Sequence, residues 1–147
     1  MKVSIARKTS KDASFLRALG QLAFGEYDLA AGEHAVRLGE RLGASTLVAY
    51  VEHRPVGFAI VELFGTRSSL DAIAVEEASR GAGVGRRLLR AAETEARNRG
   101  ATELGLVTAE ANLGALDLFL KAGFRIEERL PGYYRRGQNA LRLRKRW

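Results

Sequence analysis

The sequence predicts an α/β (α+β) protein in which a mixed sheet carries helices on both faces. Two observations predict this class: apolar segments of strand length recur seven times, and four other segments repeat apolar residues with the 3.6-residue period of a helix. In chain order the elements are β-α-α-β-β-β-α-β-α-β-β. A chain of 147 residues is long enough for one ordinary core, so we expect a single domain over residues 1–147.

The first half of the chain is expected to contain a strand, two helices and three further strands. Residues 3–7 alternate as a strand does, and Ser10 can cap a helix that continues to about residue 22. The apolar residues of this helix recur at helical spacing: Phe15, Leu16, Leu19 and Leu22. A second helix covers about residues 29–42. Residues 46–51 and 56–64 predict a β-hairpin with a turn containing Pro55, and residues 70–75 form the next strand.

The second half is expected to alternate helices with strands. A helix over about residues 83–99 ends at Gly100 in a left-handed conformation, and its buried stripe consists of Leu88, Leu89, Ala92 and Ala96. Residues 103–108 predict a strand. Asn112 then caps a short helix that ends at Gly123 and carries one apolar face, Ala115, Leu116, Phe119 and Leu120. Residues 124–130 and 140–145 are the closing strands.

A basic, glycine-dense turn lies between the strand of residues 70–75 and the helix that follows. Glycine lacks a Cβ, so this backbone can adopt positive φ and direct several N–H groups to one point, while the helix N-terminus adds a partial positive charge. Such a turn is typical of a phosphate-binding site. Arg86 stands where a dinucleotide fingerprint needs its third glycine and where a Walker A loop needs lysine, so both motifs are excluded. The turn consists of Arg80, Gly81, Ala82, Gly83, Val84, Gly85 and Arg86.

The pattern Arg80-x-x-Gly83-x-Gly85 resembles the acetyl-CoA loop of the GNAT superfamily of N-acetyltransferases. The order of elements also resembles the GNAT fold over essentially the whole chain. This resemblance implies a mostly antiparallel central sheet, acetyl-CoA (coenzyme A) as the cofactor, and a pyrophosphate held by the turn of residues 80–86. It also implies that the preceding strand contacts the pantetheine arm and supplies an oxyanion-stabilising N–H near its centre, through Ile73, Ala74 and Val75.

A second motif, residues 112–124, is similar to a GNAT helix motif that begins with asparagine and ends with Gly-Phe. The resemblance implies that Asn112, besides capping the helix, contacts the cofactor. Many relatives have a tyrosine at the position of Phe119, where it protonates the departing thiolate. A phenyl ring donates no proton, so the resemblance implies that Phe119 only borders the cofactor. Either another donor protonates the thiolate, or the thiolate leaves as the anion or takes its proton from water.

A third motif, residues 131–140, resembles the Tyr-Tyr loop of N-terminal protein acetyltransferases, including the ribosomal-protein alanine acetyltransferases. The resemblance implies that Tyr133 or Tyr134 acts as a substrate clamp or proton donor, and that Glu26 and Tyr27 line the acceptor site. Two acidic residues of the ribosomal-protein enzymes are absent. Their positions hold Val107 and Asn139.

An attacking amine must first lose a proton, so the reaction needs a base or a chain of water molecules. Asp71 shares the strand parity of Ile73 and Val75 and is therefore expected to face the same cleft. Glu62, near the end of the preceding strand, is the other candidate base.

Composition limits the other functions. The absence of cysteine excludes disulfides and a cysteinyl intermediate, and His34 and His53 lack metal-ligand spacing, so we expect a cytoplasmic, metal-free protein. The net charge of +7 favours an anionic partner. In residues 140–146 leucines alternate with basic residues, which predicts a solvated basic face. Nucleic-acid binding there is the weaker alternative, because few aromatic residues accompany it.

The sequence therefore predicts an N-acetyltransferase that moves an acetyl group from acetyl-CoA to a protein N-terminus or small amine by direct attack in a ternary complex. The alternative is a non-catalytic acyl-CoA-binding or regulatory module, since Phe119 and Val107 replace residues that carry chemistry. No segment has the roughly 20 apolar residues that span a bilayer, and no signal peptide is apparent. A homodimer paired through the C-terminal strand is compatible with the sequence.

Overall fold

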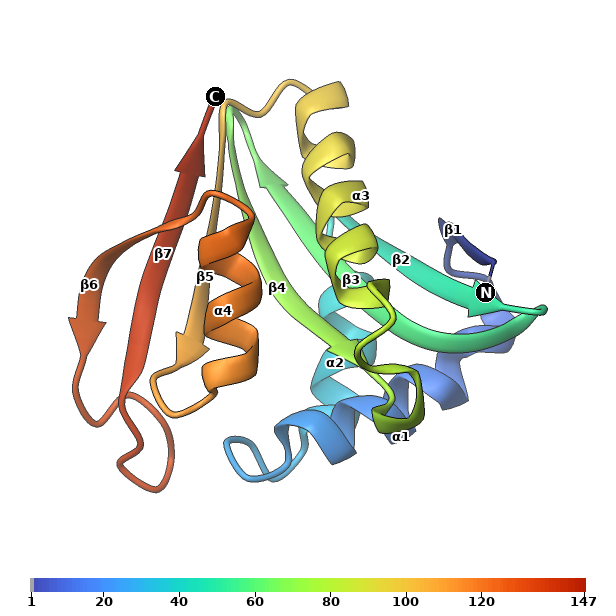
Figure 1. Ribbon diagram of the computed structural model, residues 1–147, viewed down its shortest axis with the longest axis horizontal. Coiled ribbons are helices and arrows are strands. Elements are labelled where there is room, and N and C mark those ends of the chain that lie inside the picture. Colours follow the sequence, from blue (N-terminus) through green and yellow to red (C-terminus); the bar gives the residue numbers. More distant parts are fainter. Residues whose placement is uncertain (1) are drawn as a thin grey trace.

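A computed structural model describes residues 2–147, and a seven-stranded sheet forms its centre (Figure 1). The strand order is β1-β2-β3-β4-β5-β7-β6, and all neighbours are antiparallel except β4 and β5. The strands are β1 (Val3–Arg7), β2 (Ala44–Val51), β3 (Arg54–Phe64), β4 (Arg67–Val75), β5 (Glu103–Ala109), β6 (Arg125–Leu130) and β7 (Ala140–Arg146). The mixed, mostly antiparallel sheet is thus confirmed.

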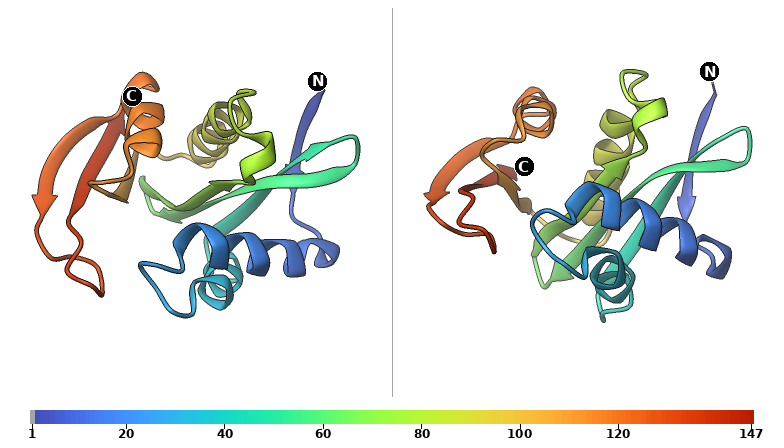
Figure 2. Two further views of the ribbon diagram at one scale, coloured as in Figure 1. Left: turned by 60° about the horizontal axis from the view of Figure 1, so that its bottom comes forward. Right: turned by 90° about the horizontal axis from the view of Figure 1, so that it is seen from below.

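Helices cover both faces of this sheet (Figure 2). The helices α1 (Ala13–Phe24) and α2 (Ala31–Gly39) lie on one face, and α3 (Val84–Asn98) and α4 (Leu113–Lys121) on the other. Among the described residues, no helix is both long and apolar enough to cross a membrane.

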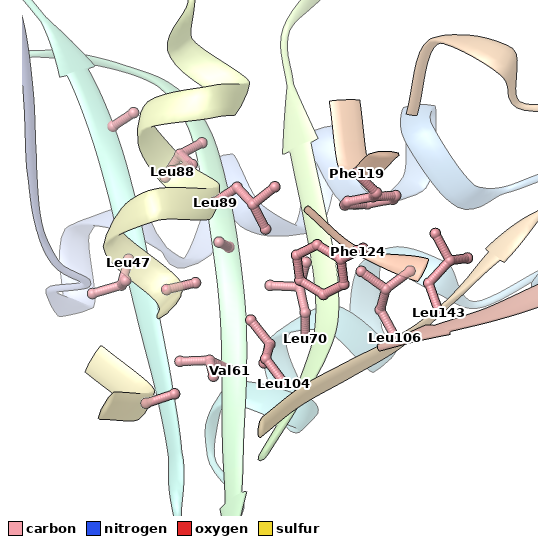
Figure 3. Close-up of a cluster of buried hydrophobic side chains, with 14 of the residues drawn as sticks. Leu47, Val61, Leu70, Leu88, Leu89, Leu104, Leu106, Phe119, Phe124 and Leu143 are labelled. Carbon is pink, nitrogen blue, oxygen red and sulfur yellow. The ribbon is translucent and has the colours of Figure 1, made fainter. Parts of the chain in front are cut away.

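Each face of the sheet has its own apolar core. Under α1 and α2 the core joins buried side chains of the helices and sheet, among them Leu16, Leu19, Phe58, Ile60 and Ala74. Under α3 and α4 the larger core includes Leu70, Leu88, Leu89, Leu104, Phe119, Phe124 and Leu143 (Figure 3). The expected buried stripe of α3 is confirmed, because Leu88, Leu89, Ala92 and Ala96 are all buried.

The two parallel strands at the centre of the sheet separate along their length. β4 and β5 pair only from Arg67 to Ser69 and from Glu103 to Gly105, after which they diverge (Figure 1). This divergence opens a V-shaped gap toward the carboxyl ends of both strands. The fold therefore provides an opening in the middle of the sheet, beside the glycine turn.

The first helical segment differs from the sequence prediction at its start and along its face. A 3₁₀ turn (Ser10–Asp12) precedes α1, and its capping residue is Thr9, not Ser10. The Thr9 backbone N–H donates a hydrogen bond to the Asp12 carboxylate at 2.9 Å. Leu22, expected on the buried face, is 85% exposed. The buried stripe runs through Gly20, and two residues turn a helix by about 200°, which places Leu22 on the opposite side.

Turns place two other element boundaries at residues different from those predicted. The second helix is shorter than expected, since α2 ends at Gly39 and a turn leads to Gly43 at φ +88°. In the β2–β3 hairpin the turn consists of Glu52 and His53, which adopt φ of 51° and 67°, and Pro55 already belongs to β3.

The basic C-terminal strand is paired with acidic side chains and is not simply solvated. Arg144 lies 3.2 Å from a carboxylate oxygen of Glu103 on β5 and 2.8 Å from one of Glu127 on β6. Arg146 contacts the same two carboxylates, and Arg142 pairs with Glu128 at 3.2 Å. Since β7 lies between β5 and β6, the expected exposed C-terminal strand is wrong, and the free edges of the sheet are β1 and β6.

Candidate functional site

The glycine turn joins the end of β4 to α3 through a short 3₁₀ turn (Glu77–Ser79). Gly81 and Gly83 adopt φ of +81° and +82°, a left-handed conformation that glycine accepts without strain. Gly83 is the residue immediately before α3, and the first α3 amide to meet a preceding carbonyl is Arg87 N, which donates to Gly83 O at 3.1 Å. Within the described residues, the amides of residues 81–86 donate to no backbone carbonyl, so they are free for an anion.

A cleft of about 1330 Å³ begins at this turn and passes through the gap between β4 and β5. On the turn side it is bordered by the ends of β4 and β5 and by α4, and on the other side by the end of α1, the α1–α2 connection and the β6–β7 loop. Of the predicted cofactor residues, ten line it: Ile73, Ala74, Val75, Arg80, Gly81, Gly83, Val84, Gly85, Arg86 and Asn112.

Helix α4 forms one wall of the cleft, and its start is fixed by Asn112. The Asn112 Oδ1 accepts a hydrogen bond from Ala115 N at 3.2 Å, which confirms the predicted cap. Helices α3 and α4 lie close together at Gly85, where an added Cβ would make an ordinary van der Waals contact with the Leu118 side chain at 3.5 Å. The wall also includes residues that the sequence prediction missed, among them Asp117, Leu118 and Lys121.

The side of the cleft facing away from the turn is narrowed by contacts between two loops. Tyr27 of the α1–α2 connection lies 4.6 Å, centroid to centroid, from Tyr134 of the β6–β7 loop. Gln138 Nε2 donates to Glu26 O at 3.2 Å. Burial raises the pKa of both Tyr27 and Tyr134 to about 12. Tyr27 and Glu26 line the cleft, whereas Tyr133 and Tyr134 do not. The ring centroids of Tyr133 and Tyr134 lie 5.0 Å apart, and the two rings are nearly perpendicular.

Asp71 does not face the cleft with Ile73 and Val75, contrary to the parity argument. The pairing of β3 and β4 shifts by one residue between Ile60 and Val61, which makes Asp71 the extra residue of a β-bulge. Leu70 consequently shares the α3 face with Ile73, and Asp71 shares the α1–α2 face with Glu62. Neither carboxyl group lines the cleft.

Phe119 and Ala82 also lie away from the cleft lining. Phe119 is 3% exposed and packs edge-on against Phe124, with ring centroids 6.0 Å apart. The ring of Phe119 belongs to the core between α4 and the sheet and does not line the cleft, so the structure gives no support to its expected contact with the cofactor. Ala82 points into solvent at the tip of the turn.

A family model described as "Acetyltransferase (GNAT) family" matches residues 15–124, which is most of the chain. The chain belongs to the GNAT acetyltransferase family. The predicted family, fold and enzyme class are thus confirmed, and the comparisons give no support to a non-catalytic module. No curated protein sequence matches the chain significantly.

Solved structures show the same fold over nearly the whole GNAT chain. It is similar to Ard1 from Thermoplasma volcanium, with 25% identity, 99% of this chain and 98% of that chain covered, and a TM-score of 0.90. It is also similar to a ribosomal-protein-alanine N-acetyltransferase from Brucella melitensis, with 25% identity, coverage of 98% and 99%, and a TM-score of 0.86.

An acetyltransferase from Salmonella typhimurium, solved with acetyl-CoA, shares 17% identity over 99% of this chain and 94% of its own, with a TM-score of 0.85. Membership of the GNAT acetyltransferase family confirms acetyl-CoA as the cofactor, and the acetyl-CoA in that structure agrees with it. The residues of the turn fit its diphosphate, since the amides of residues 81–86 donate to no backbone carbonyl among the described residues, and Gly81, Gly83 and Gly85 line the cleft.

Proposed function

We propose that this GNAT acetyltransferase acetylates a primary amine, either a protein N-terminus or a small amine, by direct attack in a ternary complex. One observation carries the proposal: a single cleft connects the glycine turn on one side of the sheet with the Tyr27 and Gln138 side on the other. Two ligands can therefore enter from opposite sides and meet in the gap between β4 and β5. Direct transfer agrees with the absence of cysteine, which removes a cysteinyl intermediate.

On the cofactor side, the residues of the turn and of β4 bind and orient. When bound, acetyl-CoA supplies the activated acetyl group. We assign the diphosphate to the amides and guanidinium groups of residues 80–86, and the pantetheine arm to the backbone of residues 73–75. Holding a long flexible carrier along its length fixes the reacting carbonyl in the position of attack.

On the acceptor side, the bridge between the two loops favours a slender acceptor. The contact between the tilted rings of Tyr27 and Tyr134 and the Gln138–Glu26 hydrogen bond narrow this entrance. A peptide with a free N-terminus fits such an entrance, and the similar structure from Brucella melitensis carries the name of a ribosomal-protein-alanine N-acetyltransferase. We therefore favour a protein N-terminus as the acceptor.

Proton transfer is assigned to the carboxyl groups and not to the tyrosines. A phenol whose pKa is raised to about 12 is a weaker acid than free tyrosine, so Tyr134 suits the role of a clamp better than that of a proton donor. Tyr133 is half exposed and supports Tyr134. Asp71 or Glu62 would accept the proton of the amine through a water molecule, since neither lines the cleft.

We also propose that the protein acts in the cytoplasm, as its lack of cysteine suggests, and as one domain. A homodimer would pair through β1 or β6, the free edges of the sheet. Nucleic-acid binding by β7 is disfavoured, because its arginines are paired with Glu103, Glu127 and Glu128.

The acceptor is tested with two matched peptides and acetyl-CoA, followed by mass spectrometry. We expect acetylation of a lysine-free peptide with a free N-terminus, and none of a peptide with a blocked N-terminus and one internal lysine. Tyr134→Phe keeps the ring that contacts Tyr27 and should retain activity, whereas Tyr134→Ala should raise the peptide KM about tenfold, roughly 1.4 kcal/mol of lost binding. Acetylation of the blocked peptide alone would contradict an N-terminal acceptor, and equal kinetics of both variants would contradict the clamp.

A further inference from the structure

We propose that Glu62 is a positioning residue for catalysis: it forms with Asp71 a buried pair of carboxyl groups that share one proton, and Asp71 is the member that takes the proton of the acceptor amine. The transfer of the amine proton to Asp71 rests on the proposed function. The shared proton itself is a property of the protein alone.

The β-bulge brings the two groups together. Glu62 on β3 lies directly opposite Ser69 on β4, and the extra residue places Asp71 on the same face as Ser69. Ser69 Oγ donates to Asp71 Oδ1 at 2.6 Å, which fixes the orientation of that carboxyl group. Asp71 is two residues beyond the last β4 residue that pairs with β5, so the pair stands at the closed end of the V-shaped gap.

Burial makes two negative charges at this place unfavourable. Glu62 is 5% exposed, and within residues 2–147 neither Glu62 Oε1 nor Asp71 Oδ2 has a hydrogen-bond partner. Two buried carboxylates side by side would repel each other, whereas one shared proton removes a charge and supplies the missing O–H···O contact. Burial and then the neighbouring Glu62 carboxyl raise the pKa of Asp71 to about 7.

The charged surroundings leave one net negative charge on the pair. Arg41, after α2, is the cation that faces it, with Nη1 at 3.6 Å from Glu62 Oε1. The residues of α1 that pack against the sheet are the apolar Leu16 and Leu19. Arg17 of α1 is engaged in an ion pair with Glu33 of α2. On β5, the carboxylate of Glu103 is already engaged by Arg67, Arg144 and Arg146. Arg41 therefore stabilises the charge on Glu62, and the proton resides on Asp71.

This arrangement gives Asp71 a basicity suited to neutral pH. An isolated aspartate, with a pKa of about 3.9, is a poor acceptor for an ammonium proton, and a base near the working pH is more effective. In the proposed step Asp71 has already lost the shared proton, as it does above about pH 7, and one ammonium proton passes through a water molecule to its carboxylate. The C–N bond then forms and the C–S bond breaks. The thiolate leaves with the electron pair of that bond, the second proton of the nitrogen passes to the thiolate through water, and the Asp71 proton returns to solvent.

Two pH profiles test the proposal, one of them without any substrate. The folded-state pKa of Asp71 lies above its unfolded value, so its contribution to stability is present below about pH 4 and is lost as pH rises to about 7. This loss should disappear in Asp71→Asn, and in Glu62→Gln its upper end should move down by about one pH unit. Glu33→Gln, which removes an exposed carboxylate of α2, is the matched control and should keep the original profile.

The second profile is kcat/KM against pH with the accepted peptide. We expect Asp71→Asn to lose about 100-fold in rate together with the acid limb, and Glu62→Gln to stay active with that limb shifted down by about one unit. An unchanged stability profile in Glu62→Gln would overturn the shared proton. A shifted stability profile with an unchanged rate profile would overturn the catalytic role of the pair. Absence of acetyl transfer by the wild type would instead refute the proposed function, and the stability profile would still decide on the pair.

Discussion

Gly83→Val is expected to weaken coenzyme A binding at least about 100-fold, a loss of roughly 3 kcal/mol. Gly83 adopts φ +82° immediately before α3, and a β-branched residue in the left-handed region is strained. The turn would have to change its path, and the free amides of residues 81–86 would no longer converge. Isothermal titration of coenzyme A into the purified variant measures this loss.

Gly100→Val is the matched control, because it places the same residue in a left-handed conformation at the other end of α3. Gly100 has φ +96°, nothing lies within 4 Å of an added Cβ, and it does not line the cleft. It should lose stability but keep its affinity for coenzyme A. Equal affinities of the Gly83→Val variant and the wild type, with the variant folded by circular dichroism, would contradict the assignment of the turn.

Phe119→Ala is expected to lower the free energy of unfolding by about 3–5 kcal/mol, because the ring fills the core between α4 and the sheet. Phe119→Tyr, which restores the tyrosine of many relatives, should cost about 1–3 kcal/mol by burying a hydroxyl beside Phe124. It should not accelerate turnover, since residue 119 does not line the cleft. Denaturant unfolding and kcat measure these two effects.

Leu120→Ala serves as the control for Phe119→Ala in the same helix. Leu120 is 44% exposed, so its loss should cost less than about 1 kcal/mol. A higher kcat in Phe119→Tyr would show that residue 119 reaches the departing thiolate. That result would contradict the placement of its ring in the core.

The sequence was sufficient for the geometry of the glycine turn and the start of α4 because both depend on local signals. Glycines at left-handed positions, a capping asparagine and an apolar strand before a helix each act within a few residues. Gly83, Gly100 and Asn112 accordingly have the conformations that their positions predicted. Most of the residues predicted to bind the cofactor line one cleft for the same reason.

The face of Asp71 and the Tyr27 side of the cleft depend on how two segments pair, and the pattern of one segment alone does not encode that pairing. The bulge at Asp71 is set by the register of β4 against β3, so an argument from strand parity alone assigned the wrong face. The charged Asp71 within an apolar strand was the one available sign of irregularity. The bridge between Tyr27 and Tyr134 likewise joins segments more than a hundred residues apart.

The arginines of β7 illustrate the same limit. Alternation of leucine with arginine correctly predicted a strand with one buried side, and Leu141 and Leu143 are buried. The partners of its basic side come from β5 and β6, whose positions beside β7 follow only from the sheet order.

The central claim is that coenzyme A lies along β4 with its diphosphate at the amides of residues 81–86. Backbone amide chemical shifts, recorded while coenzyme A is titrated into the protein, test it directly. We predict that the largest changes occur at residues 73–75, at the end of β4, and at residues 81–86 of the glycine turn. Unchanged amides there, with the changes gathered instead in the groove between β1 and α3 that Val3, Ile5, Arg87 and Arg90 line, would contradict it.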